Sequence, residues 1–328
     1  MKTLRWGVVG TGGIANSMAR MIKMADNAEL AAVSSRRMET AQEFASDHGV
    51  PDAFDSWEEM CGSDTVDAIY VATPTSVREE ICLAAANNGK HVLGEKPFAS
   101  LPSVRRITAA CRDNNVAFMD GTHFVHHPRT LDIKASREAR LGFTWSVASA
   151  FQFNLPDRGN IRFNPELEPM GAIGDAGWYN MRAAVEYLSP DAVLDTVSSH
   201  LRRDAQTGAA ISGTGVLDFT DGSTSTWNCG FDSGAVVMDL RITGTGGVIN
   251  IDDFLGQNPD GSADFLYRKG GWGRGSSEDI NIPSAKPGAA LMFEDMATAA
   301  AEPALREQWM TATELTQALL DAAWLGAL

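Results

Sequence analysis

The chain has 328 residues and a formal net charge of −15, and 44% of its residues are hydrophobic. A length of this order favours two domains, because single hydrophobic cores stop growing at about 250–300 residues. The negative charge argues against nucleic acid as a partner, since no lysine- and arginine-rich block offsets it. No apolar run approaches the roughly 20 residues that span a bilayer. Strand-like sequence begins almost at the first residue, so we expect a soluble, cytoplasmic protein without a membrane partner.

Residues 1–122 alternate short apolar runs with longer segments of helical period, which is the pattern of parallel strands joined by helices. The predicted strands are Leu4–Val9, Leu30–Ser34, Ala68–Ala72, His91–Gly94 and Ala117–Asp120. The predicted helices between them are Ala15–Met24, Met38–His48, Val77–Asn88 and Leu101–Asn114. This order predicts a doubly wound α/β domain over residues 1–122.

Residues 123–328 have a different pattern and predict a second, α+β domain. Its predicted strands are Phe143–Phe153, Asp195–Arg203, Ser212–Phe219, Ser223–Cys229, Ala235–Thr243 and Val248–Asp252. Consecutive strands with few helices between them predict a large, mostly antiparallel open sheet. We expect extended loops over Gly256–Gly288 and terminal helices over Leu291–Ala300 and Pro303–Leu325. A free apolar sheet face would favour a homodimer or homotetramer.

A glycine-rich turn, Gly10-Thr11-Gly12-Gly13-Ile14-Ala15, directly follows the first strand. It fits the dinucleotide fingerprint of a Rossmann domain, with alanine in the third glycine position. The first glycine permits a tight turn, the second lets the backbone approach a pyrophosphate, and the alanine is small enough for close helix packing. A purely structural glycine turn is the alternative, but the position between strand and helix favours cofactor binding by residues 10–14.

The end of the second strand carries the cofactor preference. An NAD-selective site usually has a carboxylate there, whereas this chain has Ser34-Ser35-Arg36-Arg37. Hydroxyl and guanidinium groups bind a 2′-phosphate that a carboxylate would repel. We therefore predict NADP(H), with NAD(H) less favoured and Ser35, Arg36 and Arg37 as contacts. Two solvated arginines at a strand end are the alternative.

Two further strands end in polar turns at the sheet edge where open α/β folds bind ligands. One turn carries Thr73 and Pro74, and the other has the sequence Gly94-Glu95-Lys96-Pro97. With the glycine-rich turn, these features resemble the Gfo/Idh/MocA oxidoreductases, of which the Glu-Lys-Pro segment is the most specific sign. The resemblance implies cofactor contacts by Thr73, Pro74, Glu95 and Lys96.

The resemblance continues in the second half, where Asp175-Ala176-Gly177-Trp178-Tyr179 matches the family's Asp-x-Gly-x-Tyr segment. The segment 161–167, with Arg162 near its start, resembles the lead-in to that motif in the subgroup of dihydrodiol, xylose and glucose–fructose oxidoreductases. Two departures stand out. Arg78 holds a place where many members have histidine, so no cofactor role is transferred to it. Tyr179 replaces the usual histidine and leaves phenol chemistry.

The family motifs imply a catalytic group of Lys96, Asp175 and Tyr179 between the two domains. Hydride transfer at a carbinol carbon needs a partner that exchanges the hydroxyl proton. Tyr179 serves if the Lys96 ammonium favours its phenolate, and Asp175 would orient substrate hydroxyls. Alternatively, Lys96 itself donates the proton. The residues also have structural interpretations: Lys96 as a surface turn residue, Tyr179 as a core aromatic, and Asp175 as a helix cap.

Neither the cysteines nor the histidines show the spacing of a metal site. The four cysteines lack a Cys-x-x-Cys pair, so we expect reduced structural thiols. The trio His123, His126 and His127 has no fourth ligand at metal spacing and favours a hinge or packing role. His123 remains a candidate for the substrate pocket, and Arg162 is either a substrate or cofactor contact or a solvated arginine.

Three functions are compatible with these motifs. The favoured one is an NADP(H)-dependent oxidoreductase acting on a sugar, polyol or related carbonyl or vicinal diol. The second is a non-catalytic NAD(P)-binding regulator of the same fold, against which the retained Lys96, Asp175 and Tyr179 argue. The third is a bifunctional enzyme that cycles tightly held nicotinamide between two sugars. The sequence does not define the substrate or the physiological direction.

Overall fold

The computed structural model describes residues 2–270 and 276–326. The chain divides into two compact units, one of residues 1–126 with 286–314 and one of residues 127–285 with 315–328. This division differs from the predicted one after residue 122, because residues 286–314 belong to the first unit. Within the described residues, no helix combines the length and the hydropathy that crossing a membrane would require.

The first unit contains a six-stranded parallel sheet in the order β3-β2-β1-β4-β5-β6. Its strands are β1 (Leu4–Val9), β2 (Ala28–Ser34), β3 (Asp52–Phe54), β4 (Ala68–Val71), β5 (His91–Gly94) and β6 (Phe118–Asp120). Five of the six residues of β1 and all of β4 are buried apolar residues or glycine, because helices cover both sheet faces. This strand order confirms the predicted doubly wound fold.

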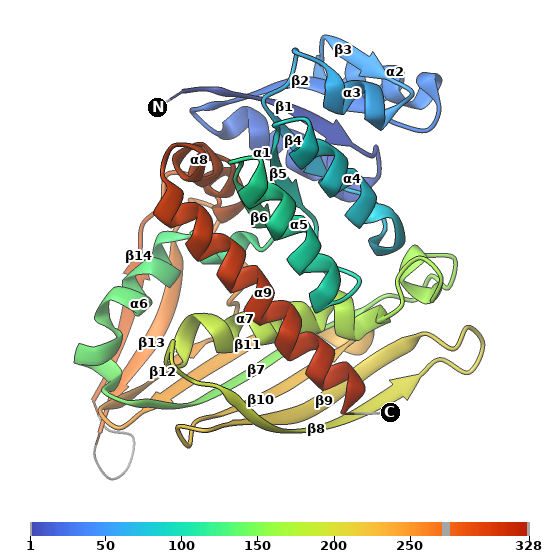
Figure 1. The fold of residues 1–328 in the computed structure, drawn as a ribbon. Helices are drawn as coiled ribbons and strands as arrows, with labels where there is room; N and C mark the ends of the chain where they lie inside the picture. The colour runs from blue at the N-terminus through green and yellow to red at the C-terminus, as the bar shows by residue number, and fades with distance from the viewer. Residues whose placement is uncertain (1, 271–275, 327–328) are drawn as a thin grey trace. The chain divides into compact units, whose positions relative to one another are not determined.

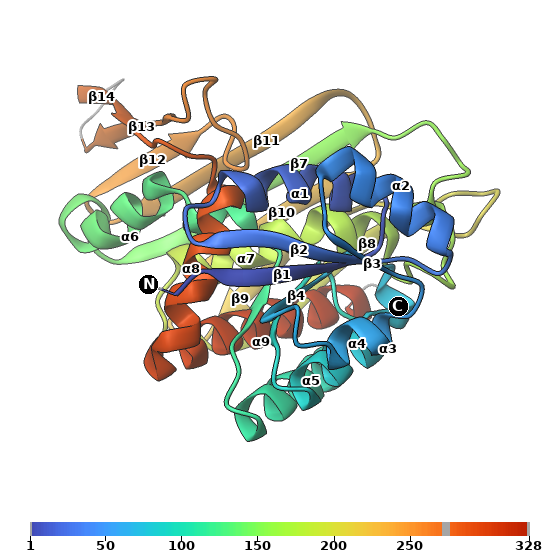
Figure 2. The ribbon, with the colours of Figure 1, turned by 90° about the horizontal axis from the view of Figure 1, so that it is seen from above.

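Helices lie on both sides of this sheet (Figure 2). They are α1 (Gly13–Met24), α2 (Met38–His48), α3 (Trp57–Gly62), α4 (Thr75–Asn87), α5 (Leu101–Asp113), α8 (Gly288–Ala301) and the start of α9 (Pro303–Leu325), with a 3-10 turn at His123–His126. Local sequence fixes several ends: Ser100 caps α5, and Gly49 ends α2 with a φ of 59°. Neither β3 nor α3 was predicted, because they are only three and six residues long.

Helix α8 completes the hydrophobic core of the first unit although it lies late in the chain. The Phe293 ring meets Trp6 edge-on at 4.9 Å and Tyr70 edge-on at 5.8 Å. Met292 and Met296 are fully buried in the same cluster as α1 and the sheet. The first unit is therefore assembled from both ends of the sequence.

The second unit contains an eight-stranded sheet in the order β14-β13-β12-β11-β7-β10-β9-β8 (Figure 1). Its strands are β7 (Thr144–Asn154), β8 (Leu194–Arg203), β9 (Ala210–Phe219), β10 (Thr224–Gly230), β11 (Asp232–Gly244), β12 (Gly247–Ile251), β13 (Ala263–Lys269) and β14 (Ser276–Ile282). All neighbouring pairs are antiparallel except β7 and β10. Helices α6 (Pro128–Leu141) and α7 (Trp178–Tyr187) lie against it, so the predicted α+β architecture is confirmed.

The predicted loop over Gly256–Gly288 is wrong for β13 and β14, which extend the sheet. Glycine, serine and aspartate lower the strand propensity of this segment, but pairing with a neighbouring strand overrides it. Phe265 of β13 is buried, whereas Glu278 and Asp279 of the edge strand β14 are exposed, as charged edge residues commonly are. Residues 271–275 of the predicted loop lie outside the described part of the chain.

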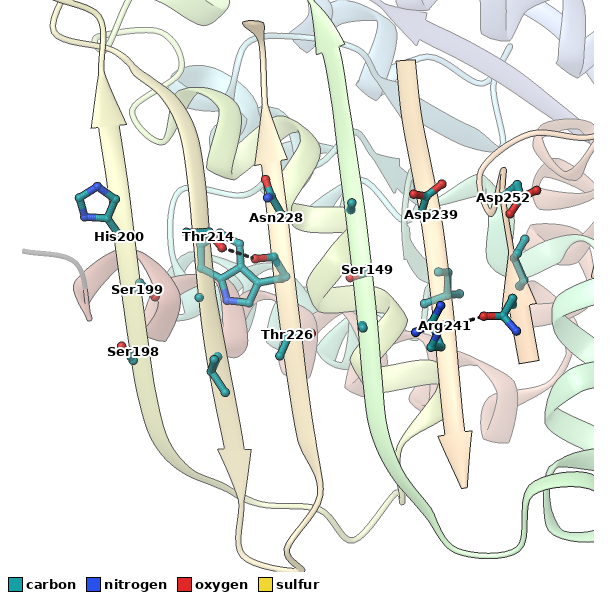
Figure 3. A pocket seen from close by; sticks show the side chains of 18 residues that line it. Ser149, Ser198, Ser199, His200, Thr214, Thr226, Asn228, Asp239, Arg241 and Asp252 are labelled. Carbon is teal, nitrogen blue, oxygen red and sulfur yellow. Dashed lines mark hydrogen bonds between the residues drawn. The ribbon is translucent and has the colours of Figure 1, made fainter. Parts of the chain in front are cut away.

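The sheet face opposite α7 carries a hollow of 730 Å³ (Figure 3). One row across the strands runs through His200, Thr214, Asn228, Ala150 and Asp239. Most side chains there are small or polar, unlike the apolar face that the sequence predicts. The predicted homodimer or homotetramer therefore stays a prediction, which light scattering on the purified chain would decide.

Burial of His91 makes the stability of the first unit depend on pH. Its Nδ1 atom accepts a hydrogen bond from the Ala117 amide at 3.0 Å. Burial, with a smaller effect of the Arg306 charge, lowers the pKa of His91 from 6.5 to about 4. The unfolded chain therefore binds the proton first, and stability is lost as the pH falls from 6.5 towards 4.

We expect His91→Asn to reduce this acid-induced loss of unfolding free energy by about 1–3 kcal/mol, because asparagine keeps an acceptor that does not titrate. Urea unfolding at about pH 7 and about pH 4.5 measures the difference. The exposed His200 provides a control, His200→Asn, that should behave like the wild type. Equal losses in wild type and His91→Asn would contradict this explanation.

Candidate active site

The carboxyl edge of the parallel sheet places three predicted site segments side by side. Val9 pairs with Val71, and Val71 pairs with Gly94, so the ends of β1, β4 and β5 form one row. Adjacent strands lie about 4.8 Å apart, which brings the turns that follow them within about 10 Å of one another. Parallel pairing therefore gathers the glycine-rich turn, Thr73 and Lys96 within the first unit.

The glycine-rich turn leaves its backbone open beside the start of α1. Gly10 has a φ of 107°, and a Cβ at this position would lie 2.9 Å from the Ala72 carbonyl oxygen, so a side chain is excluded. A Cβ at Gly12 or Gly13 would meet nothing within 4 Å. The first turn of α1 has no acidic residue, and the amide groups there are suited to an anion.

Two side chains that the sequence did not single out, Asn16 and His48, hold the backbone of this turn. The Asn16 amide nitrogen donates to the carbonyl oxygens of Thr11 and Gly12, both at 3.0 Å. Its Oδ1 atom lies 2.7 Å from Nε2 of His48 at the end of α2. The fold thus brings together Asn16 and His48, which no sequence motif connects, and Asn16 holds the backbone of the glycine-rich turn.

The end of β2 presents the residues predicted to select the cofactor. Backbone bonds fix this end: the Gly10 amide donates to the Ser34 carbonyl at 2.9 Å, and the Ser35 amide donates to the Phe54 carbonyl at 3.1 Å. The side chains of Arg36 and Arg37 are exposed. Arg36 and Arg37 therefore directly follow the end of β2, where the Ser34 carbonyl bonds to Gly10 of the glycine-rich turn.

Glu95 holds Lys96 in place from inside the protein. The buried Glu95 carboxylate accepts from the Tyr70 hydroxyl at 2.6 Å and from the Lys96 amide at 3.3 Å. A Cβ at Gly121 would approach this carboxylate to 2.9 Å, so the fit also requires glycine there. The Glu95 carboxylate is thus bound within the protein, and the predicted cofactor contact of this residue stays a prediction.

His123 belongs to the same unit as Lys96, and the positive charge of Lys96 acts on its imidazole. Burial, followed by the positive charge of Lys96, lowers the pKa of His123 to about 4. The imidazole is therefore neutral at neutral pH and suited to hydrogen bonding. The neighbouring His126 instead packs into the unit, where Nδ1 contacts Asp295 at 2.6 Å and the ring stacks on Trp309 at 4.6 Å.

In the second unit, Asp175 and Arg162 form an ion pair that the sequence motifs did not predict. Asp175 lies in a π-helical turn, Ile173–Gly177, before α7. The Arg162 guanidinium donates to both carboxylate oxygens, with Nε–Oδ2 at 2.7 Å and Nη2–Oδ1 at 3.1 Å. The cap of α7 is Gly177, so Asp175 does not cap that helix. Arg162 is therefore paired with Asp175, and its predicted contact with a substrate or cofactor stays a prediction.

Tyr179 belongs to the first turn of α7, and only 7% of its surface is exposed. The Phe151 ring of β7 meets the Tyr179 ring edge-on at 5.6 Å. The next residue, Asn180, ties α7 to the sheet through a hydrogen bond to the Ser149 hydroxyl at 2.9 Å. The position of Tyr179 is therefore fixed by sheet packing and a buried polar contact.

The described part of the chain contains no candidate metal site built from His, Cys, Asp or Glu side chains. No set of three or more His, Cys, Asp or Glu side chains there is arranged to hold an ion. The four cysteines are buried, reduced thiols. Burial raises the pKa of Cys61 to about 12, which leaves the thiol unreactive near neutral pH.

The fold and these residues define a two-domain oxidoreductase with an amino-terminal dinucleotide-binding domain. A family model described as an oxidoreductase family with an NAD-binding Rossmann fold matches residues 4–122, and the GFO/IDH/MocA C-terminal domain matches residues 134–250. D-xylose 1-dehydrogenase (NADP(+)) 2 of Haloferax volcanii is 31% identical over 82% of this chain and 82% of its own length. The chain belongs to the GFO/IDH/MocA oxidoreductase family.

Two other proteins illustrate the range of its relatives. The scyllo-inositol 2-dehydrogenase (NADP(+)) of Bacillus subtilis is 28% identical over 93% of this chain and 90% of its own length. The crystal structure of a 3-ketoreductase from Actinomadura kijaniata, in complex with NADP and TDP-benzene, matches with a TM-score of 0.89 and 23% identity over 99% and 98% of the two chains. The structural match supports the same fold.

We expect Arg162→Met to lower the unfolding free energy by about 1–3 kcal/mol, because Asp175 is mostly buried and loses two charged hydrogen bonds. Chemical denaturation measures the change. Arg202→Met is the matched control, since its pair with Asp232 is exposed and should contribute about 1 kcal/mol or less. Adding Asp175→Asn to Arg162→Met should recover part of the loss; full additivity of the two substitutions would count against the pairing.

Proposed function

We propose that the chain is an NADP(H)-dependent oxidoreductase that transfers hydride between the nicotinamide and a sugar, a polyol or a related carbonyl or vicinal diol. The observation that carries the proposal is the row Val9–Val71–Gly94, which sets the glycine-rich turn and Lys96 at one sheet edge. A dinucleotide crosses this edge in doubly wound folds, at the point where the strand order reverses. Here that point lies between β1 and β4.

The residues present fit NADP. The open backbone at Gly12 and Gly13 and the start of α1 would hold the pyrophosphate, with Thr11 and Ile14 beside it. Ser35, Arg36 and Arg37 would hold the 2′-phosphate. The Thr73 hydroxyl is buried without a hydrogen-bond partner among the described residues, as expected for a group that serves a ligand. Thr73 and Pro74 would then border the nicotinamide.

The bound cofactor supplies or accepts a hydride, and the protein must manage the accompanying proton. In the proposed mechanism, Tyr179 donates a proton to the substrate oxygen during reduction and accepts it during oxidation. The Lys96 ammonium favours the phenolate of Tyr179 and stabilises negative charge on the substrate oxygen. Asp175, oriented by Arg162, accepts hydrogen bonds from substrate hydroxyls. In the alternative assignment Lys96 donates the proton and Tyr179 positions it.

The substrate class is supported by the relatives and by the polar groups of the site. Relatives are named for xylose, inositol and deoxysugar-nucleotide substrates, all of which present several hydroxyl or carbonyl oxygens. Asp175 and the neutral His123 are hydrogen-bonding groups that suit such a substrate. The non-catalytic regulator is not favoured, and aldose dehydrogenase or sugar ketoreductase activity is the specific proposal.

We expect Lys96→Met and Tyr179→Phe each to lower kcat by about 100-fold or more, because each removes a group used in proton transfer. NADP(H) absorbance with aldoses, polyols and cyclic diols measures turnover. Since both residues act in one step, the double variant should lose much less than the product of the single losses. Tyr187→Phe, on the same helix, is the control that should keep activity. Wild-type turnover in both single variants would refute the mechanism.

We expect the double substitution Arg36→Ala and Arg37→Ala to weaken kcat/KM for NADP⁺ by about 10- to 100-fold, because charged hydrogen bonds to the 2′-phosphate are lost. The value for NAD⁺ should change little. Steady-state kinetics with each cofactor measures the ratio. A wild-type enzyme that prefers NAD⁺, or equal losses with both cofactors, would refute the assigned selectivity.

A further inference from the structure

Arg78 occupies a position that ordinary helix chemistry disfavours. It lies in the first turn of α4, near the positive end of the helix dipole, and only 4% of its surface is exposed. Burying a guanidinium there is unfavourable unless strong hydrogen bonds compensate for the lost water. A residue that breaks a local rule in this way commonly serves a site.

The Arg78 guanidinium bonds to two separate turns. Nη2 donates to the Thr73 carbonyl, and Nη1 donates to the Pro97 carbonyl and to the Thr75 hydroxyl, the last at 3.1 Å. The Thr75 hydroxyl in turn donates to the Pro97 carbonyl at 3.3 Å. One side chain thus ties the turn after β4 to the turn after β5.

The second of these turns carries Lys96, which is now held from both sides. Glu95 precedes it and is anchored to Tyr70, while Pro97 follows it and is anchored to Arg78. The amide of Glu95 also bonds to the Val71 carbonyl at 3.0 Å. Without the Arg78 contacts, the Pro97 carbonyl would keep only the weaker hydrogen bond from the Thr75 hydroxyl, so the Lys96 turn could shift on that side.

We propose that Arg78 is a positioning residue that sets Lys96 relative to the Thr73–Pro74 turn. This inference rests on the proposed function for the role of Lys96. The fork of the guanidinium reaches three acceptors at once, which the single ammonium of lysine does not reproduce. Arg78 therefore acts on turnover through the position of Lys96.

The test compares Arg78→Met and Arg78→Lys with the control Arg106→Met. Arg106 belongs to the same unit and pairs with the neighbouring Glu79 on the surface. Because a displacement of about 1 Å in a reacting group costs on the order of 100-fold, both Arg78 variants should lose kcat by about 10- to 100-fold. The KM for NADP⁺ should change by about threefold or less. In a third variant, Arg78→Ala, added guanidinium ion should restore part of the lost activity. Arg106→Met should retain wild-type values.

Hydrogen exchange provides a readout that needs no substrate. In Arg78→Met and Arg78→Lys, amides in segments 72–76 and 94–98 should exchange at least about tenfold faster, while α1 and β2 stay unchanged. Unchanged exchange in both segments, a uniform increase throughout the unit, or wild-type kcat in Arg78→Lys would each overturn the proposal. If the wild type turns over no sugar or polyol, the proposed function fails, and the exchange result still decides whether Arg78 holds the two turns.

Discussion

Parallel pairing in the first unit is the constraint on which the functional site depends. Because the carboxyl ends of β1, β4 and β5 lie in register, three turns that are distant in sequence meet at one edge. Each turn is then fixed by a different device: a glycine without room for a side chain, a buried guanidinium, and a carboxylate anchored to a tyrosine. The relative positions of the three turns are thus set by the sheet edge more than by any single residue.

Sequence patterns were sufficient for the architecture and for the motifs with local rules. Apolar runs predicted every strand of the parallel sheet except the three-residue β3, and the glycine-rich turn was recognisable because tight turns and close backbone approach require particular residues. Most strands of the second unit also followed from alternation. The edge strands β13 and β14 did not, since their serine, aspartate and glycine content is typical of loops and their strand conformation comes from pairing with neighbours.

Side-chain partnerships in the site were beyond sequence reasoning. The pairs Arg162–Asp175 and Asn16–His48 join residues whose separation follows no helical or strand period, so only the folded chain brings them together. Glu95 is a second example, because the motif did not indicate that its carboxylate binds the Tyr70 hydroxyl inside the protein. A motif identifies which residues matter at a site, and tertiary packing decides which of them face a ligand and which support the others.

The position of α8 has a consequence for biosynthesis. Phe293 packs on Trp6 and Tyr70, and Met292 and Met296 fill the same core. A ribosome that has released the first 126 residues has therefore released a sheet whose core is still incomplete. The whole second sheet is synthesised before α8, so apolar surface beside β1 stays uncovered during that time and is exposed to aggregation unless a chaperone binds it.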